Sequence, residues 1–97
     1  MIDLELRYLT LVREILASKV PMFGVWVFGS RVTGTSVKYS DLDLVLVAET
    51  KVDQRVIEDL KDAFSESDLP IQVDVLDWWA LPDSLRKIVA SRHEVLQ

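Results

Sequence analysis

Residues 22–47 read MFGVWVFGSRVTGTSVKYSDLDLVLV, two apolar runs separated by a polar segment that opens with Gly29-Ser30. The first run, residues 22–28, is rich in aromatic and β-branched residues and has the length of a buried strand. Residues 41–47 form a second run of strand length. The segment between them, residues 31–40, is polar and contains Gly34, which favours a short helical turn followed by a loop. This stretch therefore predicts two consecutive strands joined by a turn and a loop.

Helices are predicted on both sides of this stretch. Apolar residues recur every three or four positions from Asp3 to about Lys19, which indicates an amphipathic helix that Pro21 ends. After the second strand, Asp53 is placed to cap a helix that runs to about Glu66.

A third strand and a last helix complete the pattern. Residues 71–76 are apolar at most positions and predict a strand, and Pro82 with Asp83 or Ser84 opens the final helix. The order is helix, strand, strand, helix, strand, helix. It predicts an α/β (α+β) fold in which a small mixed sheet is flanked by helices.

The composition restricts the class of protein. With 97 residues and 49 % hydrophobic content, we expect a single domain over residues 1–97. The absence of cysteine excludes disulfides and thiolate metal sites and fits a cytoplasmic protein. No stretch reaches the ~20 apolar residues of a membrane span, and the N-terminus does not resemble an export signal. A net charge of −5 argues against direct binding of nucleic acid, since that affinity comes mainly from clustered basic residues.

Two carboxylates share one face of the second strand. Because side chains alternate along a strand, Asp41 and Asp43 project to the same side. Such a pair repels, so a folded protein keeps it mainly where a cation or a reaction uses it. Mg²⁺ is the expected cation, since it binds through one or two carboxylates together with substrate phosphates. Zinc is a poor competitor, because the chain has no cysteine and only one histidine, His93.

A phosphate site is predicted just before this pair. Gly29 permits close approach of the backbone to an anion, and Ser30 adds a hydroxyl donor. Arg31 and Lys38 are further candidates for phosphate contacts, and we include Arg31 in the predicted nucleotide site. The Mg-nucleotide would then be held by Gly29 and Ser30 on its phosphates and by Asp41 and Asp43 on its metal.

A third acid is expected from the third strand. Asp74 completes the cluster if that strand pairs beside the second, and Asp77 is the alternative. We prefer Asp74, because an acid inside an apolar strand is otherwise costly, whereas Asp77 lies at the strand end. With two Mg²⁺ ions, Asp74 would bind the ion that activates an attacking hydroxyl and could accept its proton.

The sequence gives less specific predictions for the remaining aromatic residues and for the histidine. Adjacent Trp78 and Trp79 are a candidate contact surface, with at least one of them expected to pack in the core. Trp26 and Phe28 are expected in the core, and His93 on the surface of the last helix.

Together these motifs resemble the minimal nucleotidyltransferases, or MNT domains, of the DNA polymerase beta superfamily. The resemblance rests on Gly29-Ser30, ten intervening residues and then Asp41-Leu42-Asp43, supported by Arg31, Gly34, Ser40 and the strand around Asp74. Thr33 departs from the family, where many members have a second basic residue. The resemblance implies a polymerase-beta-like palm fold and use of ATP.

The resemblance also implies a biological role. Members of this size act as antitoxins that transfer AMP from ATP to a tyrosine of a HEPN-domain toxin. Two alternatives stay open: a non-catalytic module that neutralises its partner by binding, and a catalytic subunit that modifies a small molecule held by a helical companion. The acceptor side would have to come from a partner, because no segment remains to form it.

Overall fold

A four-stranded mixed sheet forms the centre of the fold. The computed structural model describes all residues, 1–97. The elements are α1 (Leu6–Lys19), β1 (Gly24–Phe28), α2 (Ser30–Thr33), β2 (Leu42–Val47), α3 (Gln54–Ser65), β3 (Val73–Asp77), the 3-10 helix η1 (Trp78–Ala80), α4 (Asp83–Ser91) and β4 (Glu94–Val95). The strand order is β3-β2-β1-β4. β1 pairs antiparallel with β2 and β4, while β2 and β3 are parallel. The predicted fold class is confirmed.

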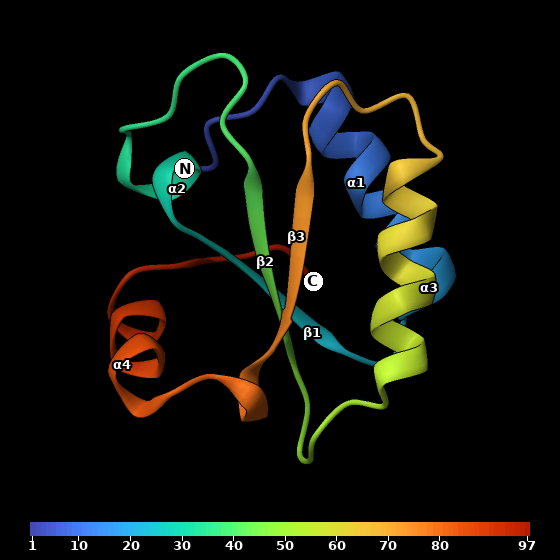
Figure 1. Ribbon diagram of the computed structural model, residues 1–97. Helices are drawn as coiled ribbons and strands as arrows, with labels where there is room; N and C mark the ends of the chain where they lie inside the picture. The colour runs from blue at the N-terminus through green and yellow to red at the C-terminus, as the bar shows by residue number, and fades with distance from the viewer.

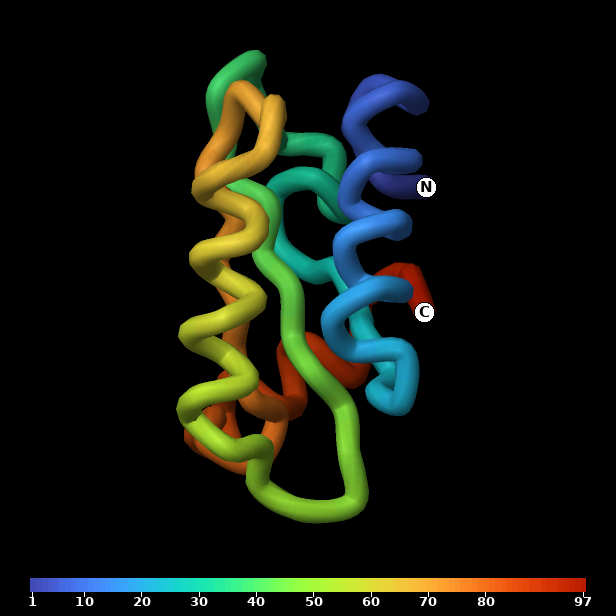
Figure 2. The backbone as a smooth tube through the Cα atoms, turned by 90° about the vertical axis from the view of Figure 1, so that its right-hand side faces the viewer, coloured from blue at the N-terminus to red at the C-terminus, as the bar shows by residue number.

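Helices cover the two faces of the sheet unequally. α1 and α3 lie on one side of the strands, on the right in Figure 1, and α2 and α4 lie on the other. Figure 2 shows α1 and α3 side by side, with β2 visible between them. None of the helices combines the length and apolar character that crossing a lipid bilayer requires.

Alternation along the strands divides the core into two parts. Leu42 and Leu44 of β2 are fully buried in the larger cluster, which is shared with α1 and α3. Val45 points the other way, into a smaller cluster with Val89 of α4. Asp43 lies on the same face as Val45 but is only partly buried. The α4 side of the sheet is therefore apolar at one end and polar at the other.

The structure differs from the sequence-based expectations at the chain ends. α1 begins at Leu6 rather than at Asp3, because the Asp3 N–H donates to the Arg31 carbonyl (2.7 Å) instead of joining a helix. The short strand β4 was not predicted, since two residues are too few to show a periodicity. Asp53 caps α3 as predicted, its carboxylate accepting from the Arg55 N–H at 2.9 Å.

Candidate active site

Gly29 joins β1 to α2 in a conformation that other residues rarely adopt. Its φ of 81° and ψ of −157° lie in a region almost restricted to glycine. A Cβ at this position would lie 2.4 Å from Oδ2 of Asp43. The glycine therefore allows the Gly29-Ser30 turn to approach the carboxylate on the neighbouring strand.

Sheet register brings two of the predicted acids together. Asp43 is paired across the antiparallel ladder with Phe28 and across the parallel ladder with Asp74. Burial raises the pKa of Asp43 from 3.8 to about 6, and the charges of Asp74 and Asp41 add to this effect. Gln72, two residues before Asp74 on the same face, donates from Nε2 to Asp74 Oδ1 at 2.9 Å. Two acids on adjacent strands thus meet on the partly exposed part of the sheet.

The third predicted acid, Asp41, is more loosely placed. It precedes β2, is exposed, and acts on Asp43 through its charge. No three acidic or histidine side chains converge closely enough to enclose a metal ion. The predicted three-acid cluster is therefore open, because Asp41 lies before the strand and Gln72 holds one oxygen of Asp74.

The chemistry of these donors still fits Mg²⁺. Asp41, Asp43 and Asp74 offer only carboxylate oxygen. Burial raises the pKa of Asp43, and the charges of Asp74 and Asp41, which raise it further, are charges that a cation would neutralise. His93 is not among them, since its ring stacks on Trp26 with centroids 3.9 Å apart. An open set of oxygen donors suits an ion that also binds phosphate and water.

Asp77, the alternative third acid, has a structural position. It is 4 % exposed, and its carboxylate accepts from the N–H groups of Val52 (3.0 Å) and Trp79 (3.1 Å). Three residues after Asp74, it points to the opposite face of the sheet. Of the two alternatives, Asp74 lies next to Asp43, whereas Asp77 holds the segments that follow β2 and β3.

Known proteins share this arrangement of sequence and fold. A family model described as polymerase beta, nucleotidyltransferase, matches residues 11–97. The probable protein adenylyltransferase MntA of Haemophilus influenzae is 45 % identical over 96 residues, which are 99 % of this chain and 84 % of that protein. This chain belongs to the polymerase beta nucleotidyltransferase family. The family resemblance predicted from the sequence is thereby confirmed.

Solved structures show the same nucleotidyltransferase fold. A toxin–antitoxin crystal structure with AMP-PNP superposes with a TM-score of 0.76 at 23 % identity, covering 92 % of this chain and 72 % of that one. A complex of the tri-AMPylated HEPN toxin of Shewanella oneidensis with its MNT antitoxin gives a TM-score of 0.65 at 21 % identity, covering 92 % of this chain and 71 % of the other. At this identity the likeness concerns the fold.

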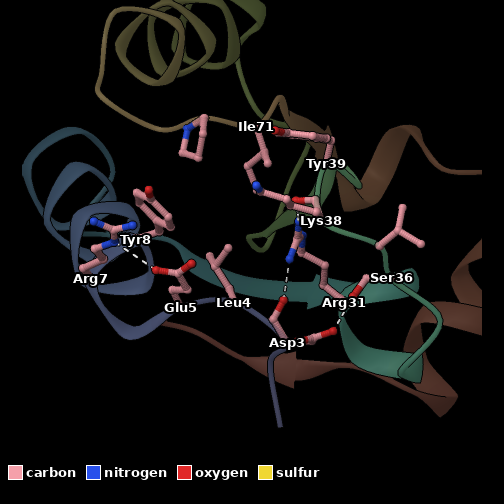
Figure 3. A pocket seen from close by; sticks show the side chains of 12 residues that line it. Asp3, Leu4, Glu5, Arg7, Tyr8, Arg31, Ser36, Lys38, Tyr39 and Ile71 are labelled. Atoms are coloured by element: carbon pink, nitrogen blue, oxygen red, sulfur yellow. Dashed lines mark hydrogen bonds and ion pairs between the residues drawn. The ribbon is translucent and has the colours of Figure 1, made fainter.

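Arg31 of the nucleotidyltransferase is buried beside the loop that leads into β2. It is 6 % exposed, and its guanidinium donates to the backbone carbonyls of Asp3 (2.6 Å), Lys38 (3.2 Å) and Ser40 (2.9 and 3.1 Å). Figure 3 shows this side chain between the N-terminal segment and the loop before β2. A guanidinium with so many carbonyl partners fixes the loop that leads into Asp41, and the phosphate contact predicted for Arg31 stays a prediction.

The same view contains a cavity of about 510 Å³ between the start of α1 and the loop before β2. Tyr8, Lys38 and Tyr39 are among its lining residues, but none of the three predicted acids is. Lys38 lies over the Tyr39 ring, 5.3 Å from its centroid. This hollow is thus separate from the candidate active site.

The aromatic residues form a group at the α4 end of the sheet. Trp78 packs against the smaller core cluster, while Trp79 is 43 % exposed and donates from Nε1 to the Ala48 carbonyl at 2.7 Å. Arg86 lies over both indole rings. His93, predicted on the surface, is half-buried because it follows α4 and stacks on Trp26.

Sequence reasoning also missed Gln72, although its spacing of two from Asp74 places both on one strand face.

Proposed function

We propose that this nucleotidyltransferase transfers AMP from ATP to a tyrosine hydroxyl of a HEPN-type partner protein and thereby acts as its antitoxin. The observation that carries the proposal is the pair Asp43–Asp74 beside the Gly29-Ser30 turn on a partly exposed sheet face. The identity of 45 % to a probable protein adenylyltransferase supports the reaction class. The toxin–antitoxin complexes of the same fold support the kind of partner.

The residues of the site divide into two roles. Gly29 and Ser30 bind the triphosphate, through the backbone N–H groups of their turn and through the Ser30 hydroxyl. Asp41, Asp43 and Asp74 are the ligands for Mg²⁺. When bound, Mg²⁺ offsets the charge of the phosphates and lowers the pKa of the attacking hydroxyl.

The transfer is a single displacement at phosphorus. The acceptor oxygen forms a bond to the α-phosphorus of ATP while the bond from that phosphorus to the bridging oxygen breaks, and pyrophosphate leaves. The hydroxyl proton passes to the carboxylate of Asp74, which lies on the outer strand and can face the acceptor. Asp43, the inner acid, stays directed at the nucleotide.

The test is transfer of mass to the partner. The chain is incubated with its HEPN-type partner, ATP and Mg²⁺, and intact masses are recorded, with Asp43→Asn as the control. We expect the partner to gain one or more AMP groups, on tyrosine, only with the wild type. A partner neutralised without added mass would replace the proposal with a non-catalytic antitoxin. Modification of a small molecule in the presence of the partner would replace it with a catalytic subunit.

A further inference from the structure

Gln72 lies beside the candidate active site, directly before β3. Its carbonyl accepts from the Leu42 N–H at 3.0 Å, so the parallel ladder already fixes its backbone next to β2. The ladder pairs Asp43 with Asp74. Two residues back in the same register, Gln72 stands beside Asp41. Three carboxylates and one neutral amide therefore occupy four neighbouring positions on the two segments.

The side-chain amide of Gln72 reaches along its own segment to Asp74. Its Nε2 donates to Oδ1 of Asp74 at 2.9 Å. An ionised carboxylate only accepts hydrogen bonds, so the nitrogen of the amide, and not its oxygen, must face it. Because the amide is neutral, it holds one carboxylate oxygen without offsetting the negative charge. A lysine or arginine at this position would offset the charge that a cation needs.

The carboxylate of Asp74 needs such a partner to keep one orientation. The torsion that sets the plane of a carboxylate is broad, so the group rotates at little cost. Asp43 is paired directly with Asp74 across the ladder, and two like charges so placed repel. The hydrogen bond from Gln72 opposes rotation of the Asp74 carboxylate. It holds Oδ1 and leaves Oδ2 for a ligand.

We propose that Gln72 is a positioning residue, whose hydrogen bond to Oδ1 orients Asp74 as a ligand of the divalent cation. This inference rests on the proposed function, which assigns Asp74 to that cation. Gln72 contacts neither the cation nor the nucleotide and acts through Asp74. Hydrogen-bond partners of metal-binding side chains are typically worth about 10–100-fold in metal affinity or activity.

The chain contains a matched control in Gln54. Gln54 donates from Nε2 to Oε1 of Glu58, also at 2.9 Å, and both hydrogen bonds are exposed to solvent. Gln54 opens α3, whereas the cavity beside Gln72 and Asp74 is lined by the other end of that helix. Replacing either glutamine by methionine keeps an unbranched side chain and removes the N–H donor. Only Gln72→Met removes a donor to an acid of the candidate site.

Binding of Mn²⁺ to the chain alone, measured from the electron paramagnetic resonance of the free ion, is the direct test. We expect Gln72→Met to lower the Mn²⁺ affinity by about tenfold, and Gln54→Met to leave it unchanged. In an Asp74→Asn background, Gln72→Met should cause no further loss, because the group through which it acts is already altered. An equal loss in both backgrounds, no loss at all, or a wild type that binds no Mn²⁺ would overturn the inference.

AMP transfer to the HEPN-type partner gives a second readout. At saturating Mg-ATP, we expect Gln72→Met to lower kcat by about 10–100-fold with an unchanged KM for the partner. Urea unfolding checks that the two methionine variants are equally folded. A higher KM for the partner at unchanged kcat would assign Gln72 to the acceptor surface and overturn the inference.

Failure of the proposed function would look different. A wild type that transfers no AMP to its partner would refute that function. A loss of Mn²⁺ affinity in Gln72→Met that disappears in the Asp74→Asn background would still support the positioning role.

Discussion

Replacing Gly29 by alanine should separate the stability of the fold from the geometry of the active site. The added methyl would meet Oδ2 of Asp43 at 2.4 Å, far below van der Waals contact. That oxygen is the end of a side chain, so rotation of the carboxylate relieves the clash at small cost. The same rotation removes the carboxylate from its place beside Asp74. Gly34→Ala is a matched control, because it too has a positive φ, 82°, but nothing lies within 4 Å of its added Cβ.

The magnitudes follow from the backbone and the displacement. Alanine in the left-handed conformation of Gly34 costs about 1–2 kcal/mol of unfolding free energy. At Gly29, with φ 81° and ψ −157°, the backbone strain is about 1–3 kcal/mol. Both variants should therefore fold. A carboxylate moved by about 1 Å can cost about 100-fold in rate, so only Gly29→Ala should lose AMP transfer.

The assay combines urea unfolding with AMP transfer to the partner under saturating Mg-ATP. We expect similar losses of stability in the two variants, and a loss of transfer of about 100-fold in Gly29→Ala alone. Equal transfer by both variants, measured on the folded fraction, would refute the idea that Gly29 is required for its approach to Asp43.

Three further predictions concern the acids and the buried arginine. Because the pKa of Asp43 is raised from 3.8 to about 6, the folded state binds more protons, and stability falls as pH rises through this range. In EDTA at neutral pH, Asp43→Asn should thus be more stable than the wild type by on the order of 1 kcal/mol, a figure reduced for solvent screening of the half-exposed group. At about pH 3 the variant should show no gain in stability. Urea titrations at both pH values test this, and a larger gain at low pH would contradict it. Asp74→Asn should abolish AMP transfer with little change in stability. Asp77→Ala should leave two backbone N–H groups unpaired and lower the free energy of unfolding by about 2 kcal/mol, while the folded fraction retains AMP transfer. The reverse pattern would exchange the roles of the two acids. Arg31→Lys should cost about 1–3 kcal/mol of stability, because one ammonium group cannot reach all the carbonyls. The Mg-ATP affinity measured by calorimetry should change little. Weaker nucleotide binding at unchanged stability would instead support the predicted phosphate contact of Arg31.

Local patterns in the sequence determined the main elements and indicated the candidate site residues. The three-to-four spacing of apolar residues located the long helices, and the apolar runs located the three main strands. Period-two alternation predicted a shared face for Asp41 and Asp43, although Asp41 lies just before β2 and is exposed. Asp53 correctly marked the start of α3. Each of these features depends on neighbours within a few positions of the chain, which is why the sequence displays it.

Only the tertiary structure decided which distant groups meet. The register of β2 with β3 aligned Asp43 with Asp74. Asp77 lies on the opposite face of β3, where it accepts from backbone N–H groups. Arg31 reads as a surface cation beside a phosphate site, yet carbonyls of residues 3, 38 and 40 surround it in the fold. Register and hydrogen-bond partners of this kind are set by how whole elements pack, and a one-residue slip would reverse every face assignment while leaving the local pattern unchanged.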